Sequence, residues 1–115
     1  MKTSILFILF LILSFNASAG VDREGVIERV WFNHSDRIWF KINNPSIDEY
    51  CKPQWYGFNL YVLKSDKDFP YYYGLITSAL SKGSRVRVSN IGIFDGQSAC
   101  NIVETGYGLL VYGNQ

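Results

Sequence analysis

Five short stretches of the chain are rich in β-branched and aromatic residues or alternate apolar with polar positions, as β-strands do. They cover residues 25–32, 37–42, 58–63, 85–88 and 108–113. In the first stretch, the even positions from Val26 to Val30 are expected on one face of the strand. The odd positions from Ile27 to Trp31 are expected on the other, because successive side chains point to opposite faces. A polar turn at residues 33–36 joins the first two strands into a hairpin.

The period changes between the third and fourth predicted strands. Apolar residues there follow the i, i+3, i+4, i+7, i+8 spacing, at Tyr72, Leu75, Ile76, Ala79 and Leu80. This stripe predicts a helix of three to four turns with one buried face. Asp68 precedes the stripe as a capping residue, Pro70 suits the first turn and Gly83 suits the end.

The predicted order β-β-β-α-β-β, without repeats or linkers, indicates a single domain. Five strands with a helix between the third and the fourth is the element order of the OB-fold, a small, partly open barrel. An open α+β sheet with the helix on one face is the alternative. We favour the barrel, because closure hides strand edges and the helix can cover the open end with its apolar stripe.

The beginning of the chain has the three parts of a secretory signal peptide. Lys2 is followed by an apolar run from Ile5 to Leu13 and by the small-residue motif Ala17-Ser18-Ala19. The apolar run is about half of the roughly 20 residues that span a bilayer. We therefore expect cleavage after Ala19, no membrane insertion, and a mature domain of residues 20–115 in the periplasm or outside the cell.

The charge of the mature domain is balanced, since its ten basic residues, without Lys2, match its ten acidic ones. No basic stripe suggests nucleic acid. Cys51 and Cys100 are the two cysteines of the chain. In an exported protein they allow one disulfide, which would close a loop of about 50 residues and contribute ~4 kcal/mol in the chain-entropy model. The alternative is two free buried thiols.

The polar residues contain no recognisable catalytic constellation. His34, the one histidine, lies in the predicted turn, and the acidic residues Asp48-Glu49, Asp66 and Asp68 lie in loops. A catalytic triad needs a nucleophile held by an oriented base, and no local motif supplies one. Two cysteines and one histidine are too few for structural zinc. We expect no catalytic residue, no metal and no cofactor; a small hydrolase using scattered carboxylates is the least favoured reading.

Aromatic residues are the remaining candidates for function. The candidates for exposed rings are Trp31, Trp39, Trp55, Tyr56, Tyr71 and Tyr73. Aromatic faces beside amides and acids hold sugars, because the ring stacks on C–H bonds while the polar groups fix the hydroxyls. Tyr71 and Tyr73 flank Tyr72 on the predicted helix, so at least one of them is expected to reach solvent or a partner subunit.

Several features of the chain form one pattern: the signal peptide, the opening strand with Gly25, Ile27 and Val30, the helix motif at 71–83, the segment Val86-Arg87-Val88, and the two cysteines. On this pattern rests a resemblance to the small exported bacterial proteins related to the B subunits of subtilase cytotoxin and typhoid toxin. It covers most of residues 25–112. It implies an OB-fold, a Cys51–Cys100 bridge, and a ring of five subunits that binds cell-surface glycans and carries a toxic A subunit.

One position departs from the toxin pattern. The toxin members have a serine that contacts sialic acid just before the glycine of the first strand, and Glu24 stands at that position here. A carboxylate repels an acidic sugar, so sialic-acid binding is not expected. The sequence predicts an exported, non-enzymatic module that binds a glycan through Asp22, Glu24, Trp31 and Tyr73. The alternative is a module that binds or inhibits another exported protein without a toxin subunit.

Overall fold

Six β-strands and one α-helix form the regular structure in the computed structural model, which describes residues 20–113. The predicted signal peptide lies outside the described residues. The elements are β1 (Arg23–Asn33), β2 (Arg37–Ile42), β3 (Leu60–Leu63), α2 (Phe69–Lys82), β4 (Arg85–Val88), β5 (Cys100–Asn101) and β6 (Leu109–Val111). The structure has one strand more than predicted, because β5 is only two residues long and too short to produce a periodic pattern.

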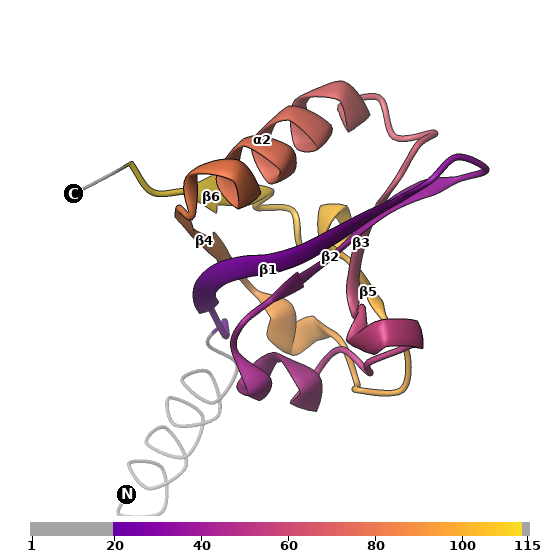
Figure 1. Ribbon diagram of the computed structural model, residues 1–115. Coiled ribbons are helices and arrows are strands. Elements are labelled where there is room, and N and C mark those ends of the chain that lie inside the picture. Colours follow the sequence, from indigo (N-terminus) through magenta and orange to yellow (C-terminus); the bar gives the residue numbers. More distant parts are fainter. Residues whose placement is uncertain (1–19, 114–115) are drawn as a thin grey trace, which may run out of the picture.

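The strands form one sheet in the order β5-β3-β2-β1-β4-β6, which curls into a half-barrel (Figure 1). The long strand β1 belongs to both halves of it. Residues 23–26 of β1 pair with β4, and residues 27–33 pair with β2. All neighbours are antiparallel except β3 and β5. Within residues 20–113, β5 and β6 remain the two ends of the sheet, so the predicted closure of the barrel is only partial.

A β-bulge in β1 overturns the predicted strict alternation of its side chains. The pairing with β2 shifts between Ile27 and Arg29. Ile27 is buried, while both Glu28 and Arg29 are exposed. A bulge places two residues opposite one on the partner strand, and it therefore changes which positions face the core. Val30 then packs on the core and Trp31 faces outward, the reverse of an uninterrupted odd–even pattern.

Helix α2 lies across one end of the half-barrel and packs against β1, β3 and β6 (Figure 1). Its predicted limits are confirmed: Asp68 precedes it, and Gly83 ends it in a left-handed conformation. The buried stripe is narrower than predicted, since Ile76 and Ala79 are buried but Leu75 and Leu80 are exposed. The side chain of Asp68 makes no capping hydrogen bond, contrary to the expected role.

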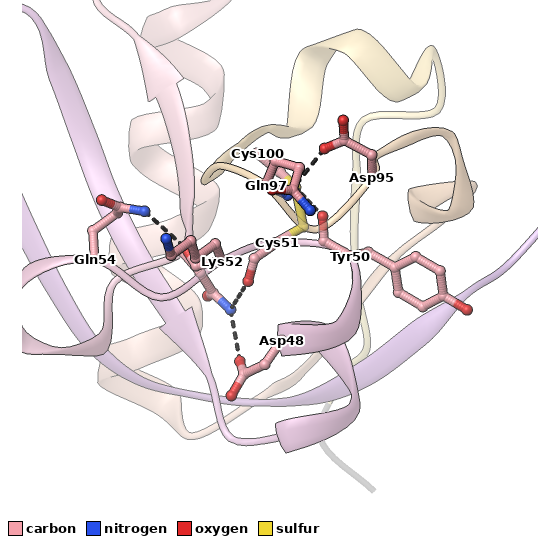
Figure 2. The surroundings of a disulfide bond; sticks show 9 residues. Asp48, Tyr50, Cys51, Lys52, Gln54, Asp95, Gln97 and Cys100 are labelled. Carbon is pink, nitrogen blue, oxygen red and sulfur yellow. Dashed lines mark hydrogen bonds between the residues drawn. A yellow bond between two sulfur atoms is a disulfide. The ribbon is translucent and has the colours of Figure 1, made fainter.

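The predicted disulfide Cys51–Cys100 is present, with its Cα atoms 5.3 Å apart. Both cysteines are buried in the main core. The buried residue Asn59 supports the bridge on both sides: its side-chain nitrogen donates to the Cys51 carbonyl at 3.1 Å, and its backbone carbonyl accepts from the Cys100 backbone N–H at 2.9 Å. Figure 2 shows the loop of residues 48–54 held against the segment that carries Cys100.

Candidate functional site

Asp22 lies just before β1 and Glu24 lies within it, both beside β4, where each forms an ion pair. Arg87 donates to the carboxylate of Asp22, and Arg85 donates to that of Glu24. Glu24 also accepts a hydrogen bond of 2.9 Å from the hydroxyl of Tyr112. We call Asp22, Glu24, Arg85 and Arg87 the charged face. Its acids already have partners within the fold.

The ion pair between Asp22 and Arg87 shifts both ionisation equilibria. Hydrogen bonds from Arg87 and from the Asn90 backbone N–H hold the pKa of the Asp22 carboxyl below its usual value. The same carboxylate raises the pKa of Arg87. An opposite charge within hydrogen-bonding distance favours the ionised form of each group. Both groups therefore remain charged at neutral pH.

Trp31 belongs to a separate group of rings on the outside of the half-barrel. Its ring centroid is 4.8 Å from that of Trp55, which in turn is 4.3 Å from that of Tyr56. Trp31 also contacts the ring of Phe58 at 6.2 Å. Trp55 and Tyr56 are 61% and 64% exposed. We call Trp31, Trp55 and Tyr56 the aromatic face.

The short 3₁₀ helix Trp55–Gly57 presents the two most exposed rings of this face. Tyr56 has a left-handed backbone with a φ of 54°, which is uncommon for a bulky residue. A side-chain nitrogen of Arg29, Nη1, donates to the Tyr56 carbonyl at 2.9 Å. Arg29 comes from the β1 bulge, so the bulge and the turn hold each other in place.

Basic and aromatic side chains continue from the aromatic face across the sheet. Trp31 pairs with Trp39 on β2, which pairs with Tyr61 on β3. The guanidinium of Arg37 lies 5.2 Å and 4.4 Å from the ring centroids of Trp39 and Tyr61, within cation–π distance. Lys41 lies on the same outer side of β2, 4.0 Å from the carboxylate of Asp48.

Tyr73 lies on α2, on the opposite side of β1 from Trp31. Its ring centroid lies 5.7 Å from that of Phe32, in an edge-on arrangement, and 6.0 Å from that of Phe69, in a tilted one. The neighbouring Tyr71 is 74% exposed, which confirms that at least one of the two tyrosines reaches solvent. The four predicted ligand contacts therefore do not converge on one place. Asp22 and Glu24 lie together, whereas Trp31 and Tyr73 each lie elsewhere.

The sequence predicts exposed rings at Trp55 and Tyr56, but no sequence pattern groups them with Trp31. No sequence pattern marks Arg29 or Lys41 as a site residue. A signal for the turn was present, because Gly57 directly follows the two rings and adopts a φ of 78°. The contact with Trp31 depends on how the disulfide-bonded loop folds back, and no local pattern encodes that.

The remaining polar candidates take part in local structure. The His34 ring packs edge-on against Phe32 at 4.8 Å. Asp48 accepts a hydrogen bond of 2.9 Å from the side chain of Asn59, and Asp66 accepts one of 2.8 Å from the backbone of Asp68. Residues 20–113 contain no group of three or more His, Cys, Asp or Glu side chains placed to hold a metal ion.

A polar hollow of about 560 Å³ lies at one end of the charged face. It is lined by Gly20, Asp22, Arg87, Ser89, Asn90 and Tyr107. Tyr107 is 72% exposed at its rim. This hollow is separate from the aromatic face, and it shares only Asp22 with the predicted ligand contacts.

Comparisons of the chain with protein-family models, curated proteins and solved structures gave no match. Among the described residues, no helix has the length and apolar character needed to cross a membrane.

Proposed function

We propose that the protein is an exported, non-enzymatic binding module that holds a glycan on the aromatic face. The observation that carries this proposal is the contact of three large rings, two of which are more than half exposed. Exposed apolar surface of this kind is unfavourable in water unless a partner covers it. The bridge between Cys51 and Cys100 suits a protein that works outside the cytoplasm.

The polar groups around the rings suit the hydroxyls of a sugar. Arg29 and Glu28 lie beside Trp31 on β1, and Lys41 and Asp48 lie on the neighbouring strand and loop. They supply both donors and acceptors at the edge of an apolar platform. A pyranose can stack its C–H bonds on a ring while these side chains bind its hydroxyls. Each basic side chain near the rings has an acidic neighbour, and Arg37 pairs with Asp36, so the charges balance and favour a neutral glycan.

The fold we propose is a partly open OB-fold, with β5 and β6 as the strands that fail to close it. The resemblance to the toxin B subunits supports this fold, and with it a ring of five subunits. Glu24 still argues against sialic acid at its position, although Arg85 and Tyr112 partly offset its charge. Light scattering of the oxidised mature protein after size exclusion tests the ring: a monomer mass contradicts it.

The test of glycan binding is a glycan array followed by calorimetry on any sugar that binds. Trp55→Ala is expected to weaken binding at least about tenfold, since buried aromatic anchors contribute ~2 kcal/mol or more and 1.4 kcal/mol is a factor of ten. Tyr71→Ala is the matched control, because Tyr71 is even more exposed than Trp55, 74% against 61%, but lies on α2. Equal loss in both variants, or an array without binding, contradicts the proposal.

The second candidate function is binding of another exported protein through the same face. The combination of Trp, Tyr and Arg side chains favours it, because these residues are enriched at the centres of protein interfaces. Pull-down of one specific protein by the wild type but not by Trp55→Ala, with no sugar affinity, would support this function over the first.

A further inference from the structure

The polar hollow beside β4 is built around the start of the described chain. The amide of Ile91 donates to the Val21 carbonyl at 2.8 Å, and the amide of Asn90 donates to the Asp22 carboxylate at 3.0 Å. Gly20 lies so close to Asn90 that a Cβ added to it would be 3.3 Å from the Asn90 side-chain oxygen. The first residues are therefore held firmly against the turn that follows β4.

The backbone of that turn is itself unusual. Asn90 adopts a left-handed conformation with a φ of 60°, which points its amide toward Asp22. Its side-chain nitrogen reaches the Thr105 carbonyl at 3.4 Å. The segment before β6, which carries Tyr107, is thereby linked to the same turn. Three segments far apart in the sequence thus meet at the hollow.

Cleavage after Ala19 would change the chemistry of this hollow. In the precursor the nitrogen of Gly20 is a neutral amide, whereas in the mature chain it is an ammonium group. The carboxylate of Asp22 already accepts hydrogen bonds from Arg87 and from the Asn90 amide. With one ammonium, one guanidinium and one carboxylate, the lining carries a net positive charge.

We propose that the hollow is a second binding site, completed by signal-peptide removal, that takes a small hydroxylated monocarboxylate. The carboxylate of the ligand lies against the Gly20 ammonium and Arg87. The hydroxyls meet Ser89 and Asn90, and the exposed ring of Tyr107 covers one face of the ligand body. The volume of about 560 Å³ is in the range of small-molecule sites. This proposal does not depend on glycan binding at the aromatic face.

The experiment uses precursors that are exported and processed, with the new amino terminus verified by mass spectrometry. D-glucuronate is the probe and D-glucose is its neutral counterpart, and binding is followed by chemical-shift changes in NMR spectra. The mature protein is expected to bind glucuronate at least about tenfold more tightly than glucose, because charge-assisted hydrogen bonds to the carboxylate are stronger than hydrogen bonds between neutral groups. Equal affinity for the two sugars would overturn the proposal.

A second precursor carries three extra residues between Ala19 and Gly20, so that cleavage leaves the Gly20 nitrogen as an amide. We expect it to lose about tenfold in glucuronate affinity, and Arg87→Gln to lose at least as much. Arg85→Gln is the matched control, since Arg85 lies on the same strand and pairs with Glu24 outside the hollow. Unchanged affinity in the extended chain, or an equal loss in Arg85→Gln, would show that the ammonium and the hollow are not the site.

Discussion

The two halves of the sheet share β1 but present different chemistry on their outer surfaces. Beside β4, the charged face matches each acid to an arginine on the next strand. Beyond the bulge, the aromatic face gathers rings from β1 and from a turn more than twenty residues away, and it leaves two of them mostly exposed. The boundary between them is the short stretch from Gly25 to Arg29, where β1 changes its pairing partner.

This difference shows on which of the two faces the side chains already have interaction partners within the fold. On the charged face each acid already has an arginine partner, although exposed pairs of this kind add little stability. The rings of the aromatic face contact one another but still expose large apolar area, which a ligand can cover with a gain in free energy. The arrangement of the aromatic face therefore points to binding, while most of the charged face is structural.

Loss of the disulfide is expected to have the largest effect and to separate the two faces. The bridge anchors the loop that leads into Trp55 and Tyr56, whereas β4 of the charged face is separated in the sheet from β5, which carries Cys100, by β3, β2 and β1. The double variant Cys51→Ser and Cys100→Ser should lower the free energy of unfolding by about 2–5 kcal/mol, measured by urea denaturation. Hydrogen exchange should accelerate more at residues 55–60 than at residues 85–88. Equal acceleration in both regions would contradict this view of the bridge.

A side chain at Gly25 is expected to have the next largest effect, because it strains the boundary between the faces. A Cβ there would lie 2.9 Å from a methyl carbon of Ile42 and 3.0 Å from the Asn43 carbonyl. Gly25→Ala should cost about 1–3 kcal/mol of stability, as overpacking of a filled site does.

The control for this variant is Gly74→Ala, since a Cβ at Gly74 meets nothing within 4 Å on the exposed side of α2. It should stabilise the protein by about 0.5–1 kcal/mol, because alanine is the better helix former. Thermal unfolding distinguishes the two. Destabilisation by both variants to the same extent would mean that close packing at Gly25 is not the cause.

The smallest expected effect is on the stability of the fold in acid. It is tested on one ion pair from each half of the sheet. Arg87 lowers the pKa of Asp22, and Arg37 at the hairpin end lowers the pKa of Asp36. Because each folded pKa lies below the unfolded one, each pair contributes stability that is complete above the usual value near 3.8. That contribution is lost as the pH falls through the lower folded value.

Asp22→Asn and Asp36→Asn should therefore each reduce the loss of stability below pH ~4, measured as unfolding midpoints across the acid range. Asp95→Asn is the control, since Asp95 has no ion-pair partner among residues 20–113. If the unfolding midpoints of Asp22→Asn and Asp36→Asn fall with decreasing pH as steeply as those of the wild type, the two ion pairs are contradicted. Added salt should narrow the difference between the variants and the wild type, because exposed pairs are screened.

Local sequence signals predicted the helix and most strands well. They failed where the structure depends on contacts with segments distant in the sequence. Gly83 ends α2 because its backbone conformation suits glycine, and the sequence alone reveals this. The bulge at Glu28 and Arg29 could not be predicted, because it exists only in the register between β1 and β2. Leu75 and Leu80 have the spacing of a buried stripe, yet both are exposed, because the sheet covers only the part of α2 around Ile76 and Ala79.

By itself, the sequence determined the elements that depend on neighbours along the chain: the hairpin, the helix with its ends, and one bridge between two cysteines. Periodicity and backbone preference act over a few residues, so they can be read without the fold. Only the tertiary structure decided that Trp55 and Tyr56 join Trp31, and that Asp22 lies beside Asn90 and Tyr107. Those contacts depend on sheet register and loop closure, which the whole chain settles through burial of its core.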